Sequence, residues 1–254
     1  MIVVLSGEGP SDLGRCSNAQ GLCRVPDFVH GPMTVLVDKV IQATFDYSLL
    51  ELTPDRYLYV SEERLRELAV QRKEAGNKVV LAGKKTGRET GYFRINAWML
   101  GEETLRVELQ ENDQAIAVLF RDSDGTRSSP ETLWKRKVES MSEGFDRSRL
   151  GVRGVPMIPK PKSEAWLLCA ARPQPYFDCA ALEERSGNDN APNPLKDELS
   201  AALQGDASAR RQVEWLNDND FDHIAVSDQM SSFAAFSDQL REALASLRSA
   251  DSAV

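Results

Sequence analysis

The stretch AIAVLFRDSDGT, residues 115–126, decides the fold. Its apolar and partly β-branched beginning is typical of a strand buried on both faces of a parallel sheet. The sequence then turns abruptly to charged residues, with Asp122 and Asp124 two positions apart. A second stretch of the same design, MIVVLSGEGPSD at residues 1–12, has a buried-strand run followed by Glu8. Both stretches predict a strand that presents carboxylates at its carboxyl end.

Weaker strand patterns and helical patterns alternate around these two strands. A capped helix is expected after Ser61, and another is expected to begin with Ser163 as its N-cap. The alternation predicts an α/β fold, a mostly parallel sheet flanked by helices. The other expected strands cover residues 56–60, 78–81 and 154–158. The other expected helices lie within residues 31–50 and 95–100 and in the segment after Pro130. Residues 82–92 are expected to be a loop.

The texture of the sequence changes after Arg172. Prolines and the stretch SGNDNAPNP then divide the chain into short polar connections and small helices. We therefore expect one catalytic α/β domain over residues 1–172. Residues 173–254 are expected to form a mainly helical C-terminal extension that packs on it.

Composition and cysteine content restrict the class of protein. The 254 residues are 41% hydrophobic and 28% charged, which is ordinary for a globular protein. No run approaches the ~18 apolar residues of a membrane span, and the first residues lack the basic segment of a signal peptide. A cytoplasmic protein that contacts no membrane is expected. The four cysteines form no CxxC pair and are expected to be scattered reduced thiols: Cys16, Cys23, Cys169 and Cys179.

The net charge of −8 is unevenly distributed. Residues 121–162 hold ten Lys or Arg against six Asp or Glu, a local balance of +4, whereas the remainder of the chain beyond them is acidic. A basic stretch beside the Asp122 pair suits a phosphate backbone. A solvated helix face explains the charge bias equally well, so the charge supports a nucleic-acid partner only together with other features.

The carboxylates predict a site for a hard cation. In open parallel sheets, ligands bind beyond the carboxyl ends of the strands, where Glu8, Asp122 and Asp124 are expected to meet. Asp12 is expected in the first turn of a following helix and on the same side. Carboxylate oxygens are the ligands that Mg²⁺ and Mn²⁺ prefer, and a divalent cation relieves their mutual repulsion.

Such a cation site predicts phosphodiester chemistry. Bound metal lowers the pKa of an attacking water and stabilises the leaving alkoxide. Basic side chains nearby neutralise charge that develops on the phosphate. The residues expected to contact phosphate or nucleic acid are Lys160, Lys162 and Arg127.

These motifs resemble the Toprim domain of topoisomerases, bacterial primases and OLD-type nucleases. That family carries a strand ending in Glu-Gly and a later strand ending in Asp-x-Asp, matched here by Glu8-Gly9 and Asp122-Ser-Asp124. Asp12, four residues after Glu8, is similar to the OLD-type form. The resemblance implies a nuclease in which Glu8 is a general acid/base and metal ligand, Asp122 and Asp124 are metal ligands, and Asp12 joins them.

A further match resembles small stand-alone Toprim-like proteins of bacteria, a group linked to defence against phage. The segment Lys160–Leu167, KPKSEAWL, contains their Glu-x-Trp-Leu pattern. By this resemblance Glu164 joins the metal ligands and Lys162 joins the catalytic residues. It also implies an ATPase partner chain, because this chain has no nucleotide-binding loop of its own, and it is compatible with a homodimer.

The resemblance covers roughly residues 1–170 and includes one departure. More than a hundred residues separate Glu8 from Asp122, about twice the spacing in a minimal Toprim domain. We therefore expect an insertion, largely helical, within residues 15–110.

Two other interpretations remain. RDSDGT also fits the first motif of haloacid-dehalogenase-type phosphatases, with Asp122 as nucleophile and Asp124 as general acid/base. That motif normally opens its domain and needs a later strand that ends in paired acids, which the sequence around 217–222 does not supply. The third interpretation is a Toprim-like module that binds without cutting, although such a module has little reason to keep crowded carboxylates.

Overall fold

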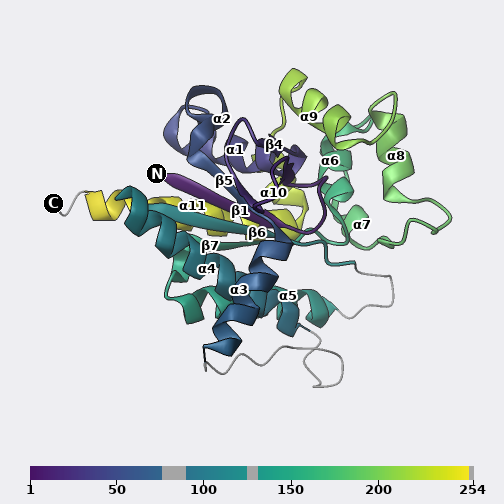
Figure 1. Ribbon diagram of the computed structural model, residues 1–254. Helices are drawn as coiled ribbons and strands as arrows, with labels where there is room; N and C mark the ends of the chain where they lie inside the picture. The colour runs from purple at the N-terminus through teal and green to yellow at the C-terminus, as the bar shows by residue number, and fades with distance from the viewer. Residues whose placement is uncertain (76–89, 125–130, 252–254) are drawn as a thin grey trace.

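A computed structural model describes residues 1–75, 90–124 and 131–251 of the chain (Figure 1). The strands of these residues form one larger sheet and one two-stranded ribbon. The strands are β1 (Ile2–Gly7), β2 (Gly14–Cys16), β3 (Leu22–Cys23), β4 (Phe28–His30), β5 (Tyr57–Val60), β6 (Ala115–Phe120) and β7 (Gly154–Met157).

Helices make up most of the remaining described structure. The helices before β7 are α1 (Pro32–Phe45), α2 (Leu49–Leu52), η1 (Pro54–Arg56), α3 (Glu62–Glu74), α4 (Gly91–Glu111), α5 (Glu131–Ser148) and η3 (Gly151–Arg153). Those after β7 are α6 (Ser163–Ala171), α7 (Ala180–Glu183), α8 (Leu195–Ala202), α9 (Ala209–Asp218), α10 (His223–Gln229) and α11 (Ser231–Asp251).

The larger sheet has the strand order β3-β5-β1-β6-β7. Strands β5, β1, β6 and β7 are parallel, and β3 is antiparallel at the edge. The register pairs Ile2 with Ala115 and Gly7 with Phe120, so β1 and β6 end at the same level. The predicted α/β fold with a mostly parallel sheet is confirmed, and the residues that follow β1 and β6 emerge side by side.

Helices cover both faces of this sheet (Figure 1). Alternate residues of each strand point to opposite faces, as in any pleated strand. Val3 and Leu5 belong to one buried cluster with side chains of α1, α6 and the C-terminal helices. Ile2 and Val4 belong to a second cluster with α3, α4 and α5. The fold is therefore a three-layer arrangement with the sheet in the middle.

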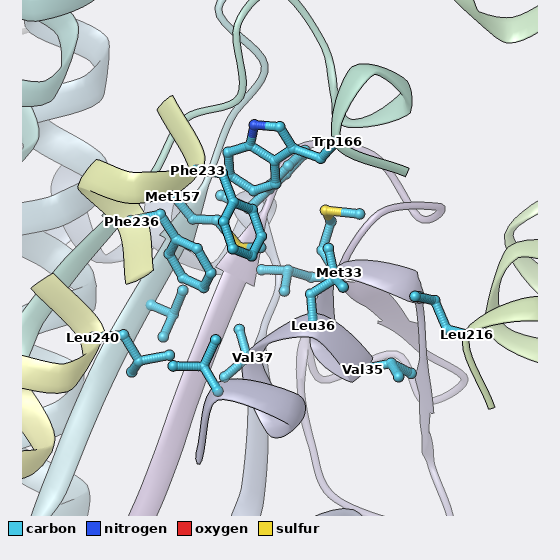
Figure 2. Close-up of a cluster of buried hydrophobic side chains, with 14 of the residues drawn as sticks. Met33, Val35, Leu36, Val37, Met157, Trp166, Leu216, Phe233, Phe236 and Leu240 are labelled. Atoms are coloured by element: carbon cyan, nitrogen blue, oxygen red, sulfur yellow. The ribbon is translucent and has the colours of Figure 1, made fainter. Parts of the chain in front are cut away.

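The C-terminal helices contribute to the first cluster (Figure 2). Trp166 of α6 is fully buried and meets the ring of Phe233 edge-on, with 5.0 Å between ring centroids. Phe236, also on α11, stacks against the same indole at 5.7 Å. Residues 173–251 thus carry helices α7 to α11, and their apolar side chains share one core with the sheet.

Several local predictions agree with the structure and others do not. Ser61 caps α3, because its hydroxyl accepts the Arg64 N–H. Ser163 is the first residue of α6 and not its N-cap, which is Lys162. The segment 15–110 contains β5, which pairs with β1 inside the sheet. The strand expected at 78–81 and most of the loop expected at 82–92 lie outside the described residues.

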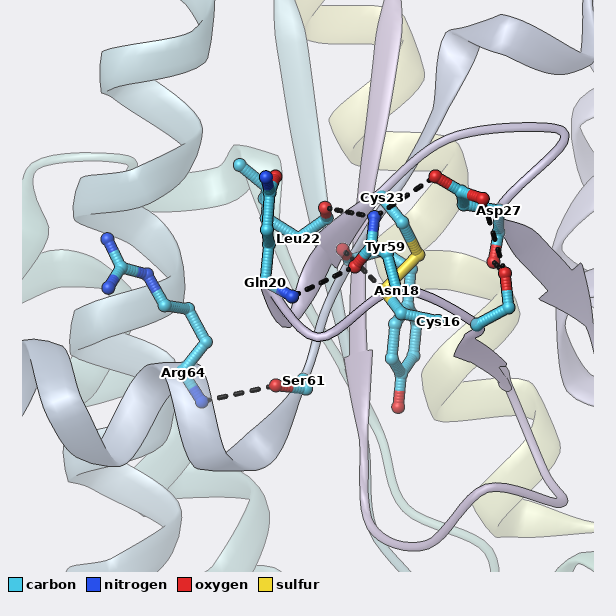
Figure 3. The surroundings of a disulfide bond; sticks show 10 residues. Cys16, Asn18, Gln20, Leu22, Cys23, Asp27, Tyr59, Ser61 and Arg64 are labelled. Atoms are coloured by element: carbon cyan, nitrogen blue, oxygen red, sulfur yellow. Dashed lines mark hydrogen bonds between the residues drawn. A yellow bond between two sulfur atoms is a disulfide. The ribbon is translucent and has the colours of Figure 1, made fainter.

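The cysteines correct another expectation. They form two disulfides, Cys16–Cys23 and Cys169–Cys179, so the prediction of reduced thiols is wrong. The chain turns between β2 and β3 and brings the first pair of Cα atoms to 5.7 Å, a normal separation for a disulfide. Figure 3 shows this bridge beside the hydrogen bond from Asn18 to Asp27.

Candidate active site

The site begins where β1 and β6 end. Glu8 follows β1 directly, and its Oε1 accepts the backbone N–H of Asp122 at 2.6 Å. Its Oε2 accepts from the Arg121 guanidinium at 3.1 Å. The register of the two strands makes these contacts possible, because it sets both strand ends at one level. The structure thus brings Glu8 and Asp122 together.

Asp12 reaches the same place by an unexpected route. The chain after Glu8 forms a turn and then β2, so the helix expected around Asp12 is absent and that prediction is wrong. Backbone bonds fix this turn, because the Asp12 and Leu13 carbonyls accept the N–H groups of Met33 and Gly31. A glycine is required at position 31, since a Cβ there would lie 2.2 Å from the Asp12 carbonyl oxygen.

The first residue of α6 joins Asp12 to Asp122. The Ser163 hydroxyl donates to Asp12 Oδ1 at 2.7 Å, and the Ser163 backbone N–H donates to Asp122 Oδ1 at 3.0 Å. This N–H is one of those left without a partner inside the helix. Glu164 follows in the first turn of α6 and is half-buried. Four carboxylates therefore meet at this edge: Glu8, Asp12, Asp122 and Glu164.

The crowding has a clear electrostatic signature. Burial is the largest cause that raises the pKa of Asp122 well above its usual range. The charges of the other three carboxylates add to this shift. Burial likewise raises the pKa of Glu8, Asp12 and Glu164, against the opposing effects of the donors and cations nearby. Ionised acids at this edge therefore repel one another strongly.

Asp124 lies at the rim of the group. It is exposed, has a φ of 47°, and its backbone N–H donates to the Pro161 carbonyl at 3.1 Å. Its charge adds to the burial that raises the pKa of Glu8, so Asp124 lies within electrostatic range of Glu8. Arg127, expected to contact phosphate, lies outside the described residues.

The two predicted lysines flank the carboxylates and are paired with other acids. Lys160 Nζ lies 2.9 Å from Glu184, and Lys162 Nζ lies 2.9 Å from Asp189. The charge of Lys162 nevertheless lowers the pKa of Asp12 and Glu164. Lys162 is therefore close to the acids, whereas Lys160 contacts only the outer Glu184 among the described ion pairs.

Sequence reasoning missed two residues of this site. Arg121 is 8% exposed and bridges Glu8 to Glu62, and Ser163 bonds two of the acids. The position of Arg121 held a signal, since a charged residue directly after a buried strand needs a partner. Nothing in the sequence indicates that the partner is Glu8.

The donor chemistry fits a divalent cation. Hard carboxylate oxygens converge from β1, β6 and α6, and their shared repulsion is what a cation relieves. Within residues 1–75, 90–124 and 131–251, no three or more acid, histidine or cysteine side chains stand close enough together to hold a metal ion. N–H and O–H donors occupy several of these oxygens, among them both oxygens of Glu8. Ligation through the occupied oxygens therefore requires the side chains to turn.

Comparisons of the chain with protein-family models, curated proteins and solved structures found no match. Within the described residues, no helix is both long and apolar enough to cross a membrane. The residues of the site therefore carry the evidence for function, because a fold alone does not imply one.

Proposed function

We propose that the protein is a Mg²⁺- or Mn²⁺-dependent nuclease of Toprim-like fold. One observation carries the proposal: four half-buried carboxylates from three separate segments converge beyond the carboxyl ends of β1 and β6. Ligands bind at this edge in open parallel sheets. Crowding of carboxylates destabilises the fold, so acids with only a structural role are seldom gathered in this way. Carboxyl groups with raised pKa values at this edge therefore favour a functional site.

The proposed roles follow from the positions of the side chains. The proposed metal ligands are Glu8, Asp12, Asp122, Asp124 and Glu164. The cation, when bound, supplies charge neutralisation at the phosphate oxygens and a lowered pKa for an attacking water. Glu8 is the proposed proton acceptor, because burial raises its pKa and so makes it a stronger base than an ordinary carboxylate.

Positive charge beside the acids supports a phosphodiester substrate. Lys162 already acts electrostatically on Asp12 and Glu164, so a phosphate bound at these acids would also meet its ammonium group. Lys160 lies two residues away and has an exposed partner that a phosphate can replace. We propose a nucleic acid as substrate, because its repeated phosphates bind both lysines at once.

The phosphatase alternative is less well supported. It requires a strand after β6 that ends in paired acids. Strand β7 is the last strand of the described residues, and the sequence after it, IPKPK, contains no acid. The third interpretation, a module that binds without cutting, does not explain why the chain keeps carboxylates that repel one another.

The test compares three variants with the wild type. Asp122→Asn and Glu8→Gln keep the size of the side chain and remove its charge. Asp46→Asn is the matched control, because Asp46 is exposed at the far end of α1 and its φ of 64° suits Asn equally well. Single-stranded DNA, double-stranded DNA, RNA and tRNA are incubated with each protein in Mn²⁺.

We expect the wild type and Asp46→Asn to cut at least one of these substrates. Asp122→Asn and Glu8→Gln should lose on the order of a hundredfold or more in rate, as expected when a catalytic charge is removed. Full activity in either site variant would contradict the assignment of that residue. Absence of cutting by the wild type on every substrate would contradict the nuclease proposal.

A further inference from the structure

Among the described residues, Arg121 is the one basic side chain that forms an ion pair with a carboxylate of the site. Its Nη1 lies 3.1 Å from Glu8, and its Nη2 lies 2.6 Å from Glu62. The guanidinium also stacks on the Tyr92 ring, 4.2 Å from the centroid. A guanidinium spans two acids and one ring face in a way that a lysine cannot. Arg121 therefore joins the active site to α3 and α4.

Both oxygens of Glu8 are occupied in this arrangement. The Asp122 N–H holds Oε1, and Arg121 holds Oε2. A divalent ion that approached Oε2 would stand against the guanidinium, and two cations in a half-buried place repel strongly. The Arg121 pair and a bound cation therefore exclude each other at this oxygen.

Arg121 keeps other partners when it leaves Glu8. Glu62 lies in the first turn of α3, where the helix dipole favours a negative charge. Glu62 is further fixed by the Tyr92 hydroxyl, which donates to it. The buried Nε of Arg121 has no hydrogen-bond partner in the described structure, so the guanidinium is not fully engaged where it lies.

We propose that Arg121 is an internal counter-ion of Glu8, which a divalent cation displaces and which remains paired with Glu62. This inference rests on the proposed function, because it concerns the same carboxylates. Arg121 is then a positioning residue: it sets the cation affinity of the site by competing for Glu8. Glu62 has the opposite effect, since it draws Arg121 away from Glu8.

Mn²⁺ titration of metal-free protein by calorimetry tests the inference, because the two kinds of variant have opposite signs. Arg121→Gln removes the competitor, and Arg121→Lys keeps the charge but cannot span both acids. Both should bind Mn²⁺ more tightly, on the order of fivefold, which corresponds to the loss of one ion pair. Glu62→Gln leaves Arg121 with Glu8 alone and should bind Mn²⁺ more weakly by a similar factor.

Arg72→Gln is the matched control. Arg72 pairs with Glu102 at 2.6 Å and stacks on Trp98 at 4.5 Å, so it has the same chemistry as Arg121 without contact to the carboxylates. Its replacement should leave the Mn²⁺ affinity unchanged. A change equal to that of Arg121→Gln would show that loss of an arginine, and not of this pair, moves the affinity.

The outcomes separate this inference from the proposed function. Mn²⁺ binding by the wild type with no tighter binding in Arg121→Gln and Arg121→Lys overturns the inference alone. Tighter binding only in Arg121→Gln also overturns it, because long-range charge then explains the result. Absence of Mn²⁺ binding in every protein overturns both. If the Arg121 variants do not fold, Glu62→Gln still decides, and equal or tighter binding by that variant overturns the inference.

Discussion

Among the four carboxylates at the sheet edge, Asp122 lies in the least favourable surroundings for a negative charge. Its pKa is raised well above its usual range, first by burial and then by the neighbouring carboxylates. A raised pKa for an acid means that the ionised form opposes folding. Its Oδ1 nevertheless accepts the Ser163 N–H, a bond that an amide oxygen can make equally well. Charge and hydrogen bonding at this residue can therefore be separated.

We expect Asp122→Asn to stabilise the metal-free protein. The variant removes the repelled charge and keeps the acceptor, so the free energy of unfolding should rise by about 1 kcal/mol, or roughly 2–4 °C in Tm for a chain of this size. Thermal melting in EDTA at neutral pH measures the change, with Asp46→Asn as control. A lower Tm than the wild type would show that the Asp122 charge is stabilised by something other than a cation.

The same shifts predict how stability and cation binding depend on pH. The pKa values of Glu8, Asp12, Asp122 and Glu164 are raised by folding, so the folded state holds protons that the unfolded state has lost. The destabilising charge is fully present above the raised values and disappears as the pH falls through them. Mn²⁺ must displace the same protons, so its affinity falls as the pH falls.

This dependence is measured as a difference between two proteins. We expect the Tm advantage of Asp122→Asn over the wild type in EDTA to shrink as the pH falls, because the wild-type carboxyl then becomes neutral too. The change is limited to about 1.4 kcal/mol per pH unit for each proton. Mn²⁺ titrations of the wild type at several pH values give the second measurement. A Tm advantage that is constant with pH would contradict the raised pKa of Asp122.

At the scale of elements, the sequence predicted strands β1 and β6, which position the site. It did not predict the turn that follows β1 or the two disulfides. Strands β1 and β6 were predictable because continuous apolar runs need burial on both faces, and the acids after them had to share an edge. The turn at Asp12 was not predictable, since it depends on backbone bonds to residues 31 and 33. The disulfides were missed for a similar reason. The first pair forms because the chain turns between β2 and β3, and the second because the chain after α6 returns Cys179 to Cys169.

The segment between α7 and α8 shields the predicted phosphate contacts. Asp189 is exposed and pairs with Lys162, whereas Lys162 itself is largely covered. An intramolecular carboxylate thus occupies the ammonium group that a phosphate would meet. Residues so far apart in the sequence gave no sign of this pair, because the positions of both loops depend on the packed core.

We expect Asp189→Asn to strengthen nucleic-acid binding. The change frees Lys162, and an exposed ion pair is worth about 0.2–1 kcal/mol, so the gain should be roughly two- to fivefold at low salt. Fluorescence anisotropy with a short oligonucleotide in EDTA measures the affinity without cutting. Asp197→Asn, at an exposed position of α8, controls for the loss of one negative charge. Equal gains in both variants would assign the effect to net charge rather than to Lys162.

At the scale of the whole molecule, the C-terminal helices and the site share one core. The sequence predicted a helical segment after residue 172. It did not predict that α11 of this segment packs against α6, the helix that carries part of the site. Helix α6 holds Ser163 and Glu164 at its first turn and Trp166 in the next, and Trp166 packs against α11. Trp166 also donates to Ser232 at 2.8 Å. The position of the acids therefore depends on residues far along the chain.

This dependence predicts that loss of one α11 side chain weakens the entire fold. Phe236 is 1% exposed, and Phe236→Ala should lower the free energy of unfolding by about 3–5 kcal/mol through the cavity left beside Trp166. Phe177→Ala is the control, because Phe177 is 66% exposed and its loss should cost less than about 0.5 kcal/mol. Urea unfolding followed by far-ultraviolet circular dichroism and by tryptophan fluorescence measures both changes.

Since the sheet and α11 share one hydrophobic cluster, Phe236→Ala should shift both signals together to lower urea in a single transition. Fluorescence and circular dichroism transitions that do not coincide would instead show that the C-terminal helices and the sheet do not unfold as one unit.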